Sequence, residues 1–139
     1  MTSKISYEET PEFQKDFKGL IKKFRSLKDD LELAKTAAIE LYHVGRADNA
    51  GVLRKIDNQS IFPIAGFCTE ELLICKITKF ACKALKGRGS KSGIRIVYAF
   101  HCNSLRVDFI EIYFKGNKEN ENRERIKEYL KNLSAASAP

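Results

Sequence analysis

The chain has 139 residues, 43% hydrophobic and 31% charged, which suits one globular domain over residues 1–139. Its formal net charge of +7 favours an anionic partner, such as nucleic acid or an acidic protein. No apolar run approaches the ~20 residues of a membrane span. Its four cysteines and two histidines show no zinc-ligand spacing, so we expect a cytoplasmic protein with free thiols, no membrane association, no metal and no cofactor.

The chain is predicted to begin with a short strand and a helix. Residues 4–7 are β-like, and Thr10 is a good N-cap residue. Pro11 then occupies the first helical position, where proline is favoured. The apolar residues that follow are spaced four, three and four apart: Phe13, Phe17, Leu20 and Phe24. This spacing predicts one buried face of a helix.

A second helix is predicted from Ser26 to about Gly45. Ser26 with Asp29 fits a variant capping box, and Gly45 is a typical helix stop. The turn between the two helices is short, so we expect an antiparallel helix pair. Residues 45–70 are predicted to be a long loop with one helical turn near residues 52–56, whose apolar end lies on the core.

The second half is predicted to contain three strands, over residues 72–82, 94–102 and 105–115, and a helix over residues 121–133. The tail, about residues 134–139, is expected to be disordered. The order β-α-α-β-β-β-α predicts an α+β fold, in which the helix pair packs on a small, twisted antiparallel sheet and a C-terminal helix follows.

Alternation along the two later strands predicts which side chains share a face. In the second strand, Ile94, Ile96, Tyr98 and Phe100 lie on one face, and Arg95, Val97, Ala99 and His101 lie on the other. In the third strand, Ile110, Ile112 and Phe114 share one face, and Glu111, Tyr113 and Lys115 share the opposite face.

Cations cluster around the loop between the predicted strands over residues 72–82 and 94–102. This loop contains three glycines and no acid, and its cations, with those at its edges, are Lys79, Lys83, Lys86, Arg88, Lys91 and Arg95. A cation cluster with few neighbouring carboxylates favours contact with phosphates. The alternative is a solvated basic turn, because charge runs are usually exposed loops.

Arg95 is the strongest single candidate for binding a phosphate. Its planar guanidinium can hold two phosphate oxygens. Lys76 lies on the neighbouring predicted strand and Lys115 ends the third, so three strands bring cations toward one surface. Glu111 and Tyr113 share the face of Lys115 and could move a proton. The alternative for Glu111 is a structural ion pair with Arg95 or Lys76.

The run from Lys76 to Lys115 resembles the RelE/ParE superfamily of toxins from toxin–antitoxin systems, most closely its HigB-type members. The matching pieces are Lys76, the run 91–95 (KSGIR), the run 96–98 (IVY) and the run 112–115 (IYFK). The resemblance covers roughly residues 5–133 and is most specific over residues 72–115. It departs from compact members at Thr78, where they have a second lysine, and near Asn122, where they have a tyrosine.

The resemblance implies a ribosome-dependent endoribonuclease that cleaves mRNA and stops translation without a metal. In this family the ribose 2′-hydroxyl attacks the adjacent phosphate and leaves a 2′,3′-cyclic phosphate. The resemblance implies catalytic roles for Arg95, Lys76, Lys115, Glu111 and Tyr113. RNA contacts are expected from Lys79, Lys83, Lys86, Arg88, Lys91 and Lys118. The implied partners are mRNA, the ribosome and a cognate antitoxin, a small helix-turn-helix protein.

Two other functions remain open on the sequence. A ParE-like toxin of the same fold inhibits DNA gyrase and does not need the basic residues of the central strands. A degenerate, non-catalytic member would use the basic surface only to bind RNA, and the departures at Thr78 and Asn122 leave this alternative open.

Overall fold

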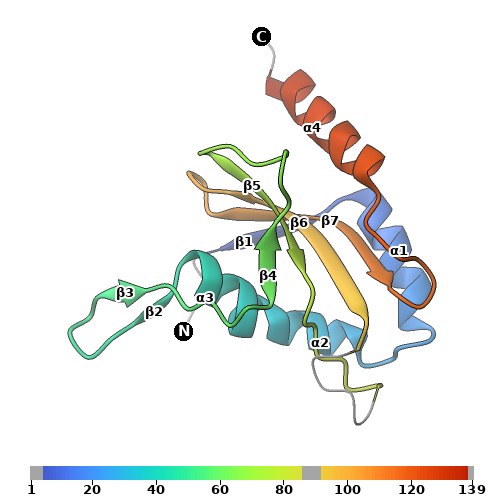
Figure 1. The fold of residues 1–139 in the computed structure, drawn as a ribbon, viewed down its shortest axis with the longest axis horizontal. Coiled ribbons are helices and arrows are strands. Elements are labelled where there is room, and N and C mark those ends of the chain that lie inside the picture. Colours follow the sequence, from blue (N-terminus) through green and yellow to red (C-terminus); the bar gives the residue numbers. More distant parts are fainter. Residues whose placement is uncertain (1–4, 86–91, 138–139) are drawn as a thin grey trace.

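A computed structural model describes residues 5–85 and 92–137. It is an α+β structure built on a mixed five-stranded sheet with the order β1-β7-β6-β5-β4 (Figure 1). The strands of this sheet are β1 (Ser6–Glu9), β4 (Ile61–Pro63), β5 (Leu72–Ile77), β6 (Ile94–His101) and β7 (Arg106–Phe114). The helices are α1 (Pro11–Ile21), α2 (Leu27–Ala34), the π-helical turn η1 (Lys35–Ile39), α3 (Glu40–His43) and α4 (Arg123–Ser137). A separate hairpin is formed by β2 (Arg46–Ala47) and β3 (Leu53–Arg54).

The start of α1 confirms the predicted cap. The Thr10 hydroxyl oxygen accepts a hydrogen bond from the backbone N–H of Phe13 at 3.2 Å, and Pro11 occupies the first helical position. The same hydroxyl donates to the carbonyl oxygen of Phe109 at 3.0 Å. The cap therefore also fixes α1 to β7, and Phe13 is fully buried beneath it.

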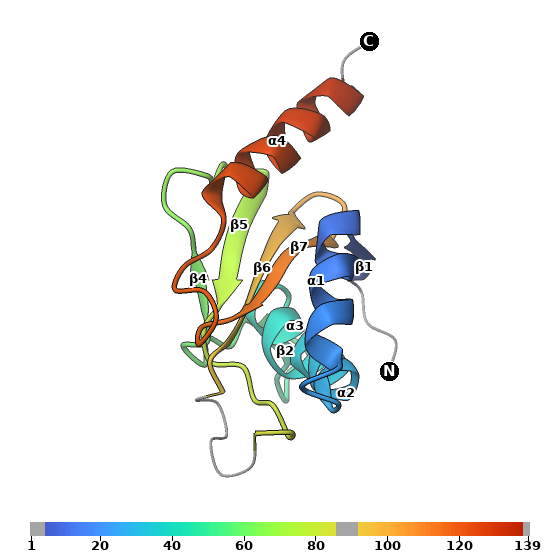
Figure 2. The same cartoon turned by 90° about the vertical axis from the view of Figure 1, so that its right-hand side faces the viewer.

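The predicted capping box of α2 does not form. The Ser26 hydroxyl instead donates to a carboxylate oxygen of Asp30 at 2.7 Å, and the N–H of Lys83 donates to the same oxygen at 3.1 Å. Asp30 is buried and so ties α2 to the segment after β5. The helix pair is also not an antiparallel hairpin: Figures 1 and 2 show α1 and α2 running across one another. Helix direction is set here by packing on the sheet rather than by the short turn.

Residues 45–70 contain three short strands where the sequence predicts a loop with a helical turn. The Asp48 carboxylate accepts hydrogen bonds from the N–H groups of Ala50 and Val52 at 2.9 and 3.0 Å, which closes the hairpin of β2 and β3. Figure 1 shows this hairpin extending away from the sheet. The third strand, β4, joins the sheet as its edge, where Pro63 is tolerated because its missing N–H costs no ladder bond.

Two features of the sheet differ from the predicted small antiparallel sheet. First, β1 pairs in parallel with β7, which makes the sheet mixed. Second, a register shift between Val97 and Tyr98 inserts an extra residue in β7, so that Val97 faces Glu111 and Tyr98 faces Phe109. This bulge changes the alternation. Ile110 therefore packs in a different core from Ile112, and the prediction that they share a face is wrong.

The sheet separates two hydrophobic cores. The larger core lies between the sheet and helices α1 to α3 and contains Ile94, Ile96, Tyr98 and Phe100 of β6, as predicted. The smaller core lies on the opposite face, which we call the α4 face, where Val97 and Ala99 pack with Ile126 of α4. Figure 2 shows the helices α1 and α2 on one side of the sheet and the first turn of α4 on the other.

Helix α4 is longer than the sequence predicts. It continues through residues 134–137, which were expected to belong to a disordered tail. Alanine and serine are compatible with a helix, and the preceding turns supply its nucleus. Figures 1 and 2 show its second half extending beyond the sheet. None of the helices within the described residues is both long enough and apolar enough to cross a membrane.

Candidate functional site

Four of the predicted catalytic side chains share the α4 face. In the sheet register Lys76 pairs with Val97, which pairs with Glu111, and Arg95 pairs with Tyr113. Directly paired residues on neighbouring strands project from the same face. The strands therefore place Lys76, Arg95, Glu111 and Tyr113 together on the α4 face, where Tyr113 also packs in the smaller core.

Arg95 is held by backbone carbonyls rather than by an acid. Its guanidinium donates to the carbonyl oxygen of Thr78 and, at 3.4 Å, to that of Ile94. Its side chain is half-buried, and among the described residues no carboxylate forms an ion pair with it. Two of its five N–H groups are thus used to orient the fork, and its positive charge stays available for an anion.

Lys76 is paired with an acid that the sequence did not single out. Its Nζ lies 3.4 Å from a carboxylate oxygen of Glu121, and the two side chains are 22% and 8% exposed. Glu121 belongs to the segment 115–122, which joins β7 to α4 and lies against the α4 face. The sequence shows this segment only as a polar break. No local pattern indicates that its carboxylate meets a lysine 45 residues earlier.

Glu111 has a different partner from the two considered from the sequence. Its side chain is 2% exposed, and it forms an ion pair with Lys118 rather than with Arg95 or Lys76. Its second oxygen accepts a hydrogen bond from the N–H of Asn122 at 2.8 Å. Both contacts come from the segment 115–122, so Glu111 anchors this segment on the sheet.

Tyr113 carries a protonated hydroxyl at neutral pH. Burial, and then the negative charges of Glu121 and Glu111, raise the pKa of Tyr113 to about 12 against the opposing effect of Arg95. The ammonium of Lys118 lies 5.4 Å from the centre of its ring. The phenol can therefore donate a proton or a hydrogen bond at this face, but it is a poor base.

The remaining predicted cations do not all reach this site. Lys115 follows β7, and its N–H donates to the carbonyl of Gly93 at 2.8 Å, so it continues the pairing at the edge of the α4 face with an exposed side chain. Lys79 lines a shallow cleft against α2, on the side of the larger core. Lys83 is exposed and bonds to Asp30 of α2 through its backbone. Lys86, Arg88 and Lys91 lie outside the described residues.

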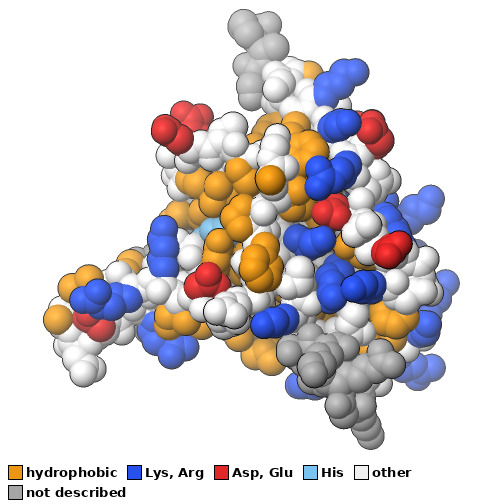
Figure 3. Space-filling model, in the orientation of Figure 1, with side chains coloured by type: hydrophobic (Ala, Val, Ile, Leu, Met, Phe, Trp, Pro, Cys, Tyr) orange, Lys and Arg blue, Asp and Glu red, His pale blue; other side chains and the backbone are white. Residues whose placement is uncertain are grey.

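The α4 face is rich in positive charge. Figure 3 views the molecule from this side and shows Lys and Arg side chains gathered to the right of its centre, among fewer acids. Lys76, Arg95 and Lys118 face two carboxylates, those of Glu111 and Glu121, and Lys115 lies at the edge. The electrostatic balance at the site is therefore cationic and can attract a phosphate.

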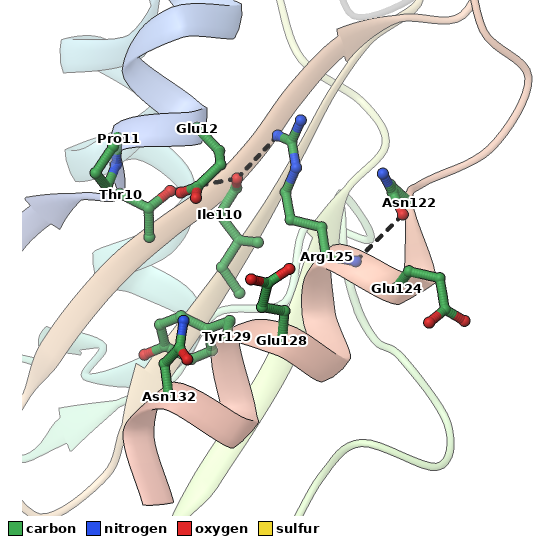
Figure 4. A pocket seen from close by; sticks show the side chains of 10 residues that line it. All are labelled: Thr10, Pro11, Glu12, Ile110, Asn122, Glu124, Arg125, Glu128, Tyr129 and Asn132. Atoms are coloured by element: carbon green, nitrogen blue, oxygen red, sulfur yellow. Dashed lines mark hydrogen bonds between the residues drawn. The ribbon is translucent and has the colours of Figure 1, made fainter. Parts of the chain in front are cut away.

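A separate cleft of about 470 Å³ lies between the start of α1 and helix α4. Figure 4 shows Glu12, Glu124 and Glu128 around it, and its Arg125 donates to the carbonyl of Ile110 at 3.3 Å. Arg125 also forms an ion pair with Asp16. This cleft is lined mainly by acids and neutral polar groups, so it does not suit a phosphate.

The thiols and histidines of the described residues form no metal site. No group of three or more His, Cys, Asp or Glu residues lies close enough to hold a metal ion in that part of the chain. The four cysteines are free; Cys75 and Cys82 are buried, Cys102 is half-buried and Cys68 is exposed. Burial raises the pKa of the Cys75 thiol to about 12, which makes it unreactive at neutral pH.

The chain has no match among protein-family models, curated proteins or solved structures.

Proposed function

We propose that this protein is an RNA-cleaving toxin of the RelE/ParE type, which acts on mRNA at the ribosome and is held inactive by a cognate antitoxin. The observation that supports the proposal best is the convergence of Arg95, Lys76 and Tyr113 on one face from three neighbouring strands. Cleavage by a ribose 2′-hydroxyl needs alignment, charge stabilisation, a base and an acid. Each of these has a candidate on the α4 face.

In the proposed reaction, Arg95 holds two oxygens of the scissile phosphate, and Lys76 turns from Glu121 toward the same phosphate. The 2′-oxygen bonds to phosphorus while its proton passes to the Glu121 carboxylate. The bond from phosphorus to the 5′-oxygen breaks, and Tyr113 donates its proton to that oxygen. A neutral phenol suits this last role because the pKa of Tyr113 is raised to about 12.

A non-catalytic RNA-binding protein is the second candidate. It is favoured by the ion pairs of Lys76 with Glu121 and of Lys118 with Glu111, because these carboxylates neutralise part of the charge that a transition state requires. Such a protein needs the cations only for affinity. A gyrase inhibitor would not need the cations of the central strands at all.

The test is cleavage of RNA by the purified protein, with and without translating ribosomes, followed by mapping of the RNA ends. We expect 2′,3′-cyclic phosphate ends, and any cleavage that occurs without ribosomes should persist in EDTA. Arg95→Ala should reduce the rate by about 100-fold or more, as expected for loss of a phosphate clamp. Arg95→Lys should restore part of the rate, since it keeps the charge without the fork.

Arg25→Ala is the matched control, because Arg25 is exposed on the turn between α1 and α2 and its loss changes the net charge equally. Equal activities of the Arg95→Ala and Arg25→Ala proteins would remove Arg95 from the mechanism. RNA binding without any cleavage would favour the non-catalytic candidate. Inhibition of DNA supercoiling that survives Arg95→Ala would favour the gyrase inhibitor.

A further inference from the structure

An aromatic side chain lies exposed beside the cationic site. Phe62 is the middle residue of the edge strand β4 and is 49% exposed, whereas Ile61 and Ile64 are only 2% and 6% exposed. Exposure of apolar surface to water is unfavourable, by about 25 cal/mol per Å². Neither of the two hydrophobic cores contains Phe62 among its described members.

The register fixes where this ring lies. Phe62 pairs directly with Lys76 of β5, so the two side chains project from the same face of the sheet. The row continues from Lys76 through Val97 to Glu111. Phe62 is therefore on the α4 face, one strand away from the first cation of the candidate site. Figure 3 shows hydrophobic atoms at the centre of this face, bordered by Lys and Arg side chains.

The Phe62 ring also makes no stacking or cation contact with the rest of the described residues. Among the described residues, no aromatic ring stacks on Phe62 and no cation lies over it, although many other rings of the chain make such contacts. Helix α4 covers the part of the face around Ile74, Val97 and Ile126 and leaves the part around Phe62 open. A flat molecule could lie on this ring without displacing any described side chain from it.

We propose that Phe62 is a stacking platform for one base of a single-stranded RNA whose phosphates lie on Lys76 and Arg95. This inference rests on the proposed function, since it names the way in which RNA would be held at the same site. Proteins that bind single strands combine a cationic track for the backbone with aromatic rings for the bases. The juxtaposition of Phe62 with Lys76 supplies both elements on adjacent strands.

A nucleobase fits this surface better than a protein side chain does. Protein-docking patches are contiguous apolar areas with few charges at their centre. Here the nearest residue across the sheet is the cation Lys76, and Arg95 follows on the next strand. A ring paired with one cation, with a second cation on the next strand, matches the alternation of bases and phosphates along a nucleic acid strand.

The experiment uses the absence of tryptophan from this chain. Phe62→Trp gives the chain a single tryptophan, whose fluorescence can be excited selectively. The probe is a short 2′-O-methyl RNA of mixed sequence, which has no free 2′-hydroxyl and is not cleaved. We expect this RNA to quench the tryptophan, and an abasic ribose-phosphate strand of equal length to leave it unquenched. Leu33→Trp is the matched control, because Leu33 is 53% exposed on α2 and should not be quenched.

Affinity gives the second measurement. Phe62→Ala and Phe62→Leu should each weaken binding of the base-bearing RNA by about 5- to 150-fold, the range reported for loss of one stacked base. Neither variant should change binding of the abasic strand, since the cations remain. The Leu variant keeps apolar area without a flat ring, so it separates stacking from general apolar contact.

The possible failures are distinguishable. RNA that binds without quenching the tryptophan, or that binds the Phe62→Ala protein as tightly as the original, would overturn the stacking platform and leave the proposed function intact. A Phe62→Ala protein that loses affinity for the base-bearing and abasic strands equally would also overturn it. A protein that binds neither strand would remove the proposed function together with this inference.

Discussion

His43 is a buried histidine whose charge state controls part of the stability of the fold. Its Nε2 is hydrogen-bonded to the hydroxyl of Tyr98 at 2.7 Å, and its ring stacks on Phe100 with centres 4.0 Å apart. Burial, and then the positive charge of Lys55, lower the pKa of His43 from 6.5 to about 4. The folded protein therefore holds the neutral ring, whereas the unfolded chain gains a proton below pH 6.5.

We expect the free energy of unfolding to fall on acidification for this reason. The contribution of His43 is complete above pH 6.5 and is lost progressively as the pH falls toward 4. Between pH 7 and pH 5 the loss should be about 2 kcal/mol. Urea denaturation at several pH values measures it, and His43→Gln, which keeps a polar partner for Tyr98, should reduce the pH dependence. If the unfolding free energy of this variant depends on pH as steeply as that of the original protein, other groups cause the pH dependence.

At the scale of elements, helix α4 depends on a small polar cluster for its attachment to the sheet. Ile126 is its fully buried apolar residue. Three residues further on, the Tyr129 hydroxyl donates to the Asp108 carboxylate of β7. Arg106 donates to the same carboxylate at 3.0 Å, and the ring of His101 lies 2.8 Å from the Tyr129 hydroxyl. The cluster compensates for the few apolar contacts of α4.

Tyr129→Phe should loosen this attachment. The substitution keeps the ring but removes the hydroxyl that joins Asp108 to His101, which should cost about 1–2 kcal/mol of unfolding free energy. Urea denaturation measures the loss. Relative to the original protein, the substitution should accelerate amide hydrogen exchange more in α4 than in β6. Lys131→Ala is the control, because Lys131 is exposed on the same helix. A loss no larger than that of the control would mean that the cluster does not hold α4.

At the scale of the whole molecule, charge is distributed unevenly around the sheet. The cleft between α1 and α4 is lined by Glu12, Glu124 and Glu128, whereas the α4 face carries Lys76 and Arg95. An anionic polymer should therefore be attracted to the part of the α4 face around Lys76 and Arg95 rather than to this cleft. The net charge of +7 alone does not give this direction.

Binding of uncleavable single-stranded RNA should accordingly depend steeply on salt. If Lys76, Arg95, Lys115 and Lys118 each neutralise a phosphate, the plot of log K against log salt should have a slope of about −3. Removing one of these charges, as in Lys115→Gln, should lower the magnitude of the slope by about 0.7. Arg25→Ala should leave it unchanged. Fluorescence anisotropy over a salt series measures these slopes. Equal slopes for the original protein, Lys115→Gln and Arg25→Ala would contradict binding at the α4 face.

The sequence by itself determined the elements that are encoded locally. The N-cap at Thr10, the apolar spacing from Phe13 onward and the alternation from Ile94 to His101 each depend on residues within a few positions of one another. The same alternation correctly separated Arg95 from the residues of its strand that pack in the larger core. Pairing of these strands then brought Lys76 and Arg95 to one face, as the sequence had predicted.

Only the tertiary structure decided the features that join distant residues. The parallel addition of β1 to β7, the bulge at Ile110 and the ion pair between Lys76 and Glu121 leave no periodic signal in the chain. The exposure of Phe62 is of the same kind, because it depends on how far α4 extends over the sheet. Local spacing specifies which face a side chain takes, but the partner on that face is set by packing between segments far apart in sequence.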